Sequence, residues 1–175
     1  MENKISYKLK RSKRAKRMRL AVFCDSSVVV TSPLGVEQLI IEKFIEQKSR
    51  WILDKLEYFK SISNSVVMKG SKRNYKKYKQ KAFILAQNRI EYFNKIYGFR
   101  FNRVNIKNQK TRWGSCSKKG NLNFNYKIAL LPERLADYII ANERCHLKEF
   151  SHSQKFWNLV AKAIPNYLYI RSELK

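Results

Sequence analysis

The sequence has few acidic residues, only two histidines and no long apolar run. Of its 175 residues, 13 are Asp or Glu and 38 are Lys or Arg, so the formal net charge is +25. This surplus of positive charge favours a polyanionic partner. Any histidine chemistry must involve both His146 and His152. No stretch of about 18 apolar residues is present, so we expect no membrane span. The N-terminus has no apolar segment long enough for a signal peptide.

Cysteine is also scarce. The three cysteines, Cys24, Cys116 and Cys145, are widely spaced and form no CxxC pair. An odd, scattered set of this kind is typical of reduced thiols, so we expect a cytoplasmic protein without a zinc ribbon. The hydrophobic fraction of 44% is sufficient for a packed core. The length indicates one domain with a small appended lobe.

The first 62 residues carry strand signals followed by a helix signal. Hydrophobic periodicity predicts strands over 5–10, 18–24 and 28–31, followed by one helix over 36–60. We therefore expect an N-terminal lobe built of a strand pair and a helix over residues 1–62. Residues 63–74, rich in Ser and Asn and without periodicity, are predicted to be a linker.

The remaining residues, 75–175, predict alternating helices and strands. An apolar stripe from Phe83 to Tyr97 predicts a helix, and Gly98 suits its left-handed end. Strands are predicted over 99–106 and 122–128, with a loop over 111–120 between them. Two further helices are predicted over 132–148 and 153–163. Ser151 or Ser153 is suited to cap the last of these helices.

One stretch of the predicted helix 132–148 carries candidate chemistry. Asn142 and His146 are four residues apart, so both side chains leave one helix face, and Glu143 lies beside them. An H-E-x-x-H helix holds zinc with this geometry and uses the Glu as a general base. His152 follows six residues later and would point about 120° away along an unbroken helix. A break near Phe150 would return it to the same face.

Spacing alone leaves two interpretations open, because position 142 is Asn. An amide oxygen is a neutral, hard donor, whereas zinc prefers imidazole or thiolate. Two histidines and an amide should bind metal less tightly and less selectively than three histidines. The alternative is that His146 and His152 are structural residues, each satisfied by hydrogen bonds.

The surrounding motifs resemble those of the YgjP-like metal-dependent hydrolases, relatives of the SprT-like zinc peptidases. The stretches that carry the resemblance are RWGSCSKKGNLNFN, LLPERLADYIIANERCHL, SHSQKFW and IPNY. The family pattern is R-W-G-S-C-S, a G-N-L strand, a proline-led helix with H-E-L-C-H-L, and then N-H-S-x-x-F-W. The resemblance implies an α+β fold, with a zincin-like metallopeptidase core over 75–175 and the N-terminal strand and helix lobe before it.

The same resemblance implies roles for individual residues. Glu143 would be the general base, His146 and His152 would be zinc ligands, and Asn142 would occupy the position of the first ligand. The implied activity is that of a zinc-dependent, peptidase-type hydrolase acting on protein or peptide, impaired at Asn142. Arg144 also departs from the family, because an apolar residue is usual there.

Several neighbouring residues admit both a binding role and a structural one. Arg112 is a candidate contact for a substrate carboxylate or carbonyl, or a member of a structural salt bridge. Trp113 is a candidate substrate contact or a loop anchor. For Cys116 and Cys145, we expect a packing role and not a role as ligands. Arg144 falls on a stripe that should be buried, so it needs a partner or must reach solvent.

The charge supports an alternative function. Residues 61–110 hold 13 Lys and Arg against one acidic residue. Tyr75 and Tyr78 alternate with lysines there, a pattern suited to phosphate contacts and base stacking. The candidate nucleic-acid contacts are Lys72, Arg73, Lys76, Lys77 and Lys79. The alternative is therefore a catalytically inactive nucleic-acid-binding protein that retains the metallopeptidase fold.

Overall fold

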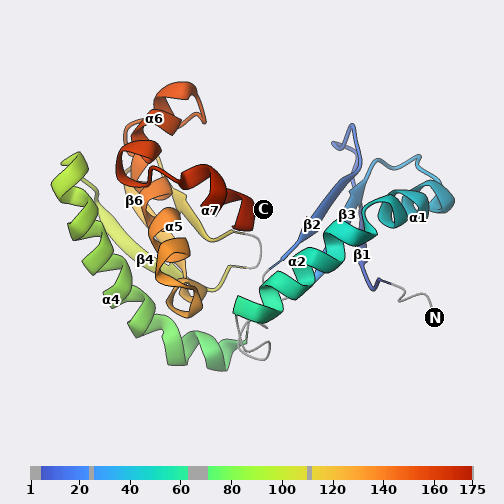
Figure 1. The fold of residues 1–175 in the computed structure, drawn as a ribbon, viewed down its shortest axis with the longest axis horizontal. Helices are drawn as coiled ribbons and strands as arrows, with labels where there is room; N and C mark the ends of the chain where they lie inside the picture. The colour runs from blue at the N-terminus through green and yellow to red at the C-terminus, as the bar shows by residue number, and fades with distance from the viewer. Residues whose placement is uncertain (1–4, 24–25, 63–70, 110–111, 175) are drawn as a thin grey trace. The chain divides into compact units, whose positions relative to one another are not determined.

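The computed structural model describes residues 5–23, 26–62, 71–109 and 112–174 (Figure 1). The chain divides into two compact units, Met1–Lys69 and Gly70–Lys175. Each unit combines helices with a small sheet, so the α+β prediction is confirmed. No helix in the described part of the chain is both long and apolar enough to span a bilayer.

The first unit contains a three-stranded sheet. Its strands are β1 (Lys8–Arg11), β2 (Arg19–Val22) and β3 (Val28–Ser32), in the order β1-β3-β2. Strands β2 and β3 pair in antiparallel orientation, and β1 adds to β3 in parallel. All three strands predicted from periodicity are therefore present, and the sheet has one strand more than the strand pair expected for this lobe. Alternate residues of β3 face the core, as their periodicity requires.

Two helices replace the single helix predicted over 36–60. These are α1 (Gln38–Gln47) and α2 (Ser49–Ile62), separated at Lys48. Ile41 and Ile45 of α1 and Ile52 of α2 belong to one hydrophobic cluster. Both helices therefore direct apolar side chains into that cluster.

The second unit begins with the long helix α4 (Lys72–Tyr97). The Ser71 side chain accepts a hydrogen bond from the Asn74 backbone N–H and so caps the first turn. Residues 72–74 are therefore helical and not part of the predicted linker 63–74. The rest of that linker, except Ser71, lies outside the described residues. Gly98 ends the helix with φ 61°, as predicted.

A second three-stranded sheet packs against α4. It consists of β4 (Arg103–Lys107), β5 (Gly114–Cys116) and β6 (Asn121–Asn125), in the order β4-β6-β5. β4 runs parallel to β6, and β5 is antiparallel to it. Leu122 and Phe124 are fully buried. The alternating asparagines of β6 lie on the opposite face of the sheet.

Three sequence expectations for this sheet need correction. β4 starts four residues later than predicted, and the predicted loop 111–120 contains the short strand β5. β5 has only three residues, which is too short for a hydrophobic periodicity that would predict a strand. The strand predicted over 122–128 ends at Asn125, whose side chain accepts a hydrogen bond from the Lys127 N–H. That bond turns the chain into the 3₁₀ helix η1 (Tyr126–Leu130).

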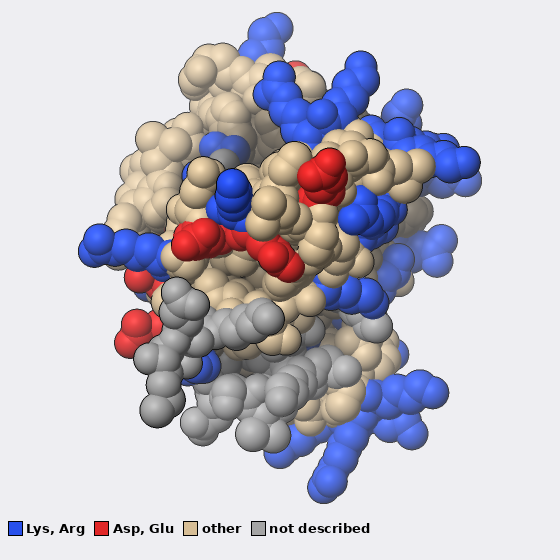
Figure 2. Space-filling model, turned by 90° about the vertical axis from the view of Figure 1, so that its right-hand side faces the viewer, with Lys and Arg blue, Asp and Glu red and all other residues tan. Residues whose placement is uncertain are grey.

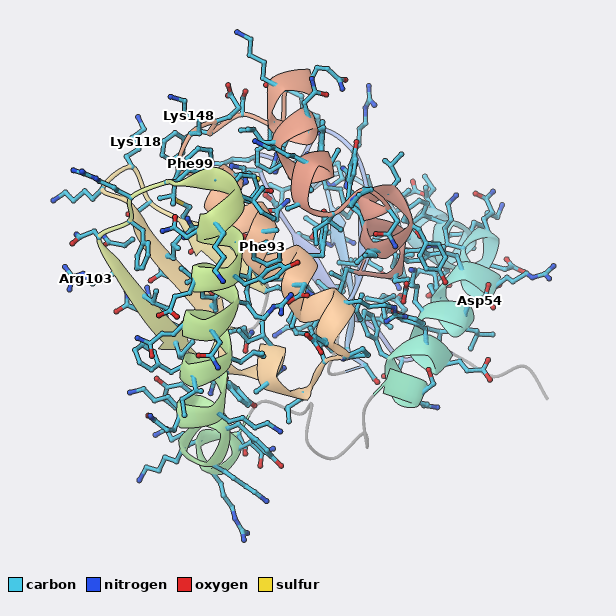
Figure 3. All side chains as sticks on the ribbon, turned by 60° about the vertical axis from the view of Figure 1, so that its left-hand side comes forward. Asp54, Phe93, Phe99, Arg103, Lys118 and Lys148 are labelled. Atoms are coloured by element: carbon cyan, nitrogen blue, oxygen red, sulfur yellow. The ribbon has the colours of Figure 1, made fainter. Side chains whose placement is uncertain are left out.

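Three more helices complete the unit: α5 (Glu133–Cys145), α6 (Gln154–Ala163) and α7 (Tyr167–Leu174). Helices α4 and α5 cover one face of the sheet, and α6 and α7 pack against α5 (Figure 1). Phe93 points from α4 toward α5 and is 1% exposed (Figure 3). The central position of α5 places its last two turns between the edge strand β5 and the C-terminal helices.

Candidate active site

The end of α5 determines how the two histidines are placed. The α-helix stops at Cys145, three residues earlier than predicted, and the chain turns through residues 146–149. His146 Nδ1 lies 3.0 Å from the carbonyl oxygen of Glu149, which closes this turn. Ser153 then caps α6, because its side chain accepts a hydrogen bond from the Phe156 N–H. The early break brings His152 back toward the end of α5.

The two imidazole rings lie next to each other. Their centroids are 4.8 Å apart, with an interplanar angle of 76°. Phe156 stacks on His146 at 4.4 Å, and Trp157 stacks on His152 at 5.5 Å. These aromatic contacts hold both rings from the side of α6.

Burial lowers the pKa of His146, which favours its neutral form. The Glu149 carbonyl oxygen can only accept, so the neutral ring pairs with it by donating a hydrogen bond from Nδ1–H, which leaves the Nε2 lone pair free. A backbone carbonyl that orients the ring in this way is the usual arrangement around a metal-binding histidine. The local geometry of His146 is therefore suited to ligation.

Glu143 is held from the opposite side by the edge strand β5. Burial raises the pKa of its carboxyl group to about 7. The positive charge of Arg112 and a hydrogen bond from the Cys116 backbone N–H act in the other direction. Such a carboxyl group can take up and release a proton near neutral pH.

Gly114 provides the space that Glu143 occupies. A Cβ added at position 114 would lie 2.5 Å from Glu143 Cγ and 2.9 Å from its Oε1. Real Cβ atoms essentially never approach another atom so closely. The glycine of the WGS motif therefore lets the carboxylate pack directly against the backbone of β5.

Asn142 lies one turn after Tyr138 on the same face of α5, and the two side chains interact closely enough to influence the pKa of the tyrosine. Burial raises the pKa of the Tyr138 hydroxyl to about 12, although Arg171 and the interaction with Asn142 lower it. The hydroxyl therefore remains protonated at neutral pH.

Two cavities meet at these residues. The first, which we call the aromatic cavity, has a volume of about 300 Å³ and is walled by Trp113, Tyr138 and Trp157. The second, the histidine cavity, has about 350 Å³ and includes His146. Five residues line both cavities: Arg112, Gly114, Asn142, Glu143 and His152. The two cavities therefore adjoin, with Glu143 and His152 at their junction.

The donor set suits a divalent cation only in part. Two imidazoles and the amide of Asn142 are available around the histidine cavity. Among the described residues, no three His, Cys, Asp or Glu side chains are grouped so as to hold a metal ion. Two nitrogen donors and a neutral oxygen accommodate such an ion, but less tightly than three imidazoles would.

Arg144 is fully buried, and only one of its nitrogens has hydrogen-bond partners among the described residues. Its Nη2 donates to Asn94 Oδ1 at 2.7 Å and to the carbonyl oxygen of Phe99 at 3.0 Å. Phe101 lies beside its guanidinium group. Nε and Nη1 have no hydrogen-bond partner among the described residues. Burial also lowers the pKa of Arg144.

The two cysteines near the site differ in their surroundings. Cys145 is buried and its thiol lies 3.5 Å from the Tyr97 hydroxyl, on the side of α4. Cys116 is half-buried and lines the histidine cavity. Burial raises the pKa of both thiols to about 11, so both are protonated at neutral pH.

Sequence reasoning missed three residues that line the aromatic cavity: Tyr138, Trp157 and Arg171. The spacing of Tyr138, four residues before Asn142, was a usable signal. Trp157 lies in the family's FW motif, but its partners come from other elements. Arg171 belongs to α7, which was not predicted.

The candidate nucleic-acid contacts lie elsewhere, on the N-terminal half of α4. All five are exposed: Lys72, Arg73, Lys76, Lys77 and Lys79. Tyr75 is not available for base stacking, because its hydroxyl donates to the Ile106 carbonyl oxygen and its ring packs on Tyr126. Tyr78 is half-buried beside Lys77.

Residues 68–175 match a family of metallopeptidase domains. The chain belongs to the YgjP-like family, described as "YgjP-like, metallopeptidase domain". Its structure is also similar to the crystal structure of the metallopeptidase zymogen of Pyrococcus abyssi abylysin. The identity is 27% and the TM-score 0.46, over 50% of this chain and 89% of that one. The search of curated proteins gave no match.

Proposed function

We propose that this chain is a metal-dependent, peptidase-type hydrolase whose metal site is weakened by Asn142. The observation that carries the proposal is the juxtaposition of the His146 and His152 rings, 4.8 Å apart, beside a cavity that Glu143 also lines. Membership of a metallopeptidase family supports a divalent cation, for which zinc is the natural candidate.

The roles in this proposal follow from the chemistry of each group. His146, His152 and Asn142 would hold the cation, which supplies Lewis acidity toward a peptide carbonyl. Glu143 takes a proton from the attacking water and passes it to the leaving amine, a task suited to a carboxyl group with a pKa near 7. Gly114 and the Cys116 N–H keep that carboxylate in position.

The test is zinc affinity, measured by competition with a coloured chelator, in the wild-type protein and in Asn142→His. We expect the substitution to raise zinc affinity at least about tenfold, because it replaces an amide oxygen by an imidazole nitrogen. Hydrolysis of an unstructured protein should rise with it. Asn88→His is the matched control, since it adds an imidazole on the exposed face of α4.

Two results would contradict the proposal. Zinc binding by Asn142→His that is no tighter than by Asn88→His would show that the two rings do not share a cation. Asn142→His that binds zinc but does not hydrolyse unstructured protein would contradict the proposed hydrolase activity. Loss of hydrolysis in an added Glu143→Gln substitution would support the role of the carboxylate.

A second candidate function is nucleic-acid binding, favoured by the charge of α4. No acidic residue occurs between Glu57 and Glu91, and the cations of the N-terminal half of α4 are exposed. Lys and Arg also outnumber Asp and Glu in the chain as a whole. On the face drawn in Figure 2, blue Lys and Arg side chains project at the edges and a smaller number of red Asp and Glu side chains lie nearer the centre. Because the Tyr75 hydroxyl bonds to Ile106 and its ring packs on Tyr126, this candidate relies on phosphate contacts.

Its test is the salt dependence of binding to a labelled DNA duplex. Binding through phosphates should weaken steeply between about 50 and about 200 mM salt. Reversing Lys76 and Lys77 to Glu should weaken it further and reduce the salt slope. Reversing Lys95 and Lys162, which are also exposed, is the control of equal charge. Equal affinities for the two double variants would argue against this surface.

A further inference from the structure

The aromatic cavity contains two cations that the proposed reaction does not use as acid or base. Arg112 and Arg171 line it from different parts of the chain, the segment before β5 and helix α7. Among the described residues, neither guanidinium group has a hydrogen bond or an ion pair with a protein group. The nearby Glu173 carboxylate is instead bound to Arg134.

Arg171 is held in place by aromatic stacking. Its guanidinium carbon lies 4.3 Å from the centroid of the Trp157 ring. Trp157 in turn stacks on Tyr167, 5.3 Å away with an interplanar angle of 9°, and on His152. A guanidinium that lies on a ring face keeps its N–H groups at the edge available for a ligand. The side chain is therefore restrained before any ligand arrives.

The charge of the cavity indicates the kind of ligand. Glu143 is the one acidic side chain among the described residues that line it, against the two guanidinium groups. The local balance is therefore positive, and it suits one additional negative charge. A planar carboxylate matches the fork of an arginine side chain. A dianion would meet stronger repulsion from Glu143, and the aromatic walls favour an apolar neighbour of the anionic group.

We propose that the aromatic cavity binds a carboxylate group of a peptide through Arg171 and Arg112. The carboxylate is either the C-terminus of the peptide or an acidic side chain. The cavity adjoins the candidate metal site, so this inference rests on the proposed function for the claim that the bound peptide is a substrate. Binding itself requires neither metal nor hydrolysis.

The experiment measures peptide affinity by fluorescence anisotropy on the full chain, with chelator present so that no turnover occurs. Four labelled peptides share one short apolar sequence. One pair differs only in a free or amidated C-terminus, and the other, amidated, differs only in an internal Glu or Gln. We expect at least one carboxylate peptide to bind about tenfold or more tightly than its neutral partner. The pair that shows the difference identifies the source of the carboxylate.

Variants of the cavity assign the effect. Arg171→Gln should remove most of the preference for the carboxylate, and Arg171→Lys should retain only part of it, because a lysine lacks the planar fork. Arg100→Gln is the matched control, since it removes an equal charge from an exposed residue outside the cavity. Near-ultraviolet circular dichroism checks that the Trp157 stack survives.

The inference is overturned if the wild-type protein binds both members of each peptide pair equally. This test does not depend on the folding of any variant. It is also overturned if Arg171→Gln keeps the full preference. Carboxylate-selective binding without hydrolysis by the zinc-loaded protein would support the inference and count against the proposed function. Hydrolysis that ignores the carboxylate would do the reverse.

Discussion

At the scale of single residues, the site depends on how closely Glu143 packs against Gly114. We expect Gly114→Ala to lower the free energy of unfolding by about 1–3 kcal/mol, because the new Cβ would displace the glutamate side chain. In a Glu143→Ala background the same substitution should cost little. Urea unfolding of the four proteins measures this coupling. Equal costs in both backgrounds would mean that the contact does not matter.

Arg144 is the other residue whose energetics can be separated from the site. Two of its nitrogens are buried without a hydrogen bond among the described residues. Replacing such a charge by an apolar side chain of similar length is often neutral or stabilising. We therefore expect Arg144→Met to raise the free energy of unfolding by about 1 kcal/mol, measured in urea. Arg144→Ala, which leaves a cavity, should lower the free energy of unfolding. A destabilised Arg144→Met variant would show that the two hydrogen bonds of Arg144 outweigh the cost of burying its charge.

The group of candidate residues around Asn142 could be predicted from the sequence because its members are close together in the chain. Asn142 and Glu143 lie in the last turn of α5, and His146 follows its end with a backbone that is still helical, so the helical period places the three close together. His152 required only one more inference, a break in the chain. Arg171 belongs to a helix about 30 residues later, and its position depends on how α7 packs on α5. No local pattern encodes such a tertiary contact.

At the scale of elements, signals at helix ends were more reliable than those within short strands. Gly98 and Ser153 have specific backbone or capping chemistry, and both lie where that chemistry predicts. The short strand β5 is defined by its pairing with β6, so its own three residues carry little information. The division of the helix predicted over 36–60 likewise follows from packing on a shared core.

The end of α4 offers a test at this scale. Gly98 has a φ of 61°, a conformation that costs an L-residue roughly 1–2 kcal/mol. Gly98→Ala should lower the free energy of unfolding by about 1 kcal/mol in urea. Gly35→Ala is the control, because no atom lies within 4 Å of a Cβ added there and its backbone is not left-handed. A cost at position 98 no larger than at position 35 would contradict this account.

At the scale of the whole molecule, the chain consists of two units with different content. The first unit has its own cluster around Val30, Ile41 and Ile52. The family match, in contrast, covers residues 68–175, which include every residue of both cavities. The proposed chemistry therefore belongs entirely to the second unit.

This division predicts that residues 68–175 fold without the rest of the chain. Buried side chains from α4, β6 and α5, among them Phe93, Phe124 and Ile140, give this segment its own core. We expect a cooperative thermal transition in near-ultraviolet circular dichroism. Zinc affinity should equal that of the full chain within about twofold, since Asn142, His146 and His152 are all retained. A fragment that folds cooperatively but binds zinc much more weakly would show that the first unit contributes to the site; a fragment without a transition would show that the second unit depends on the first for its stability.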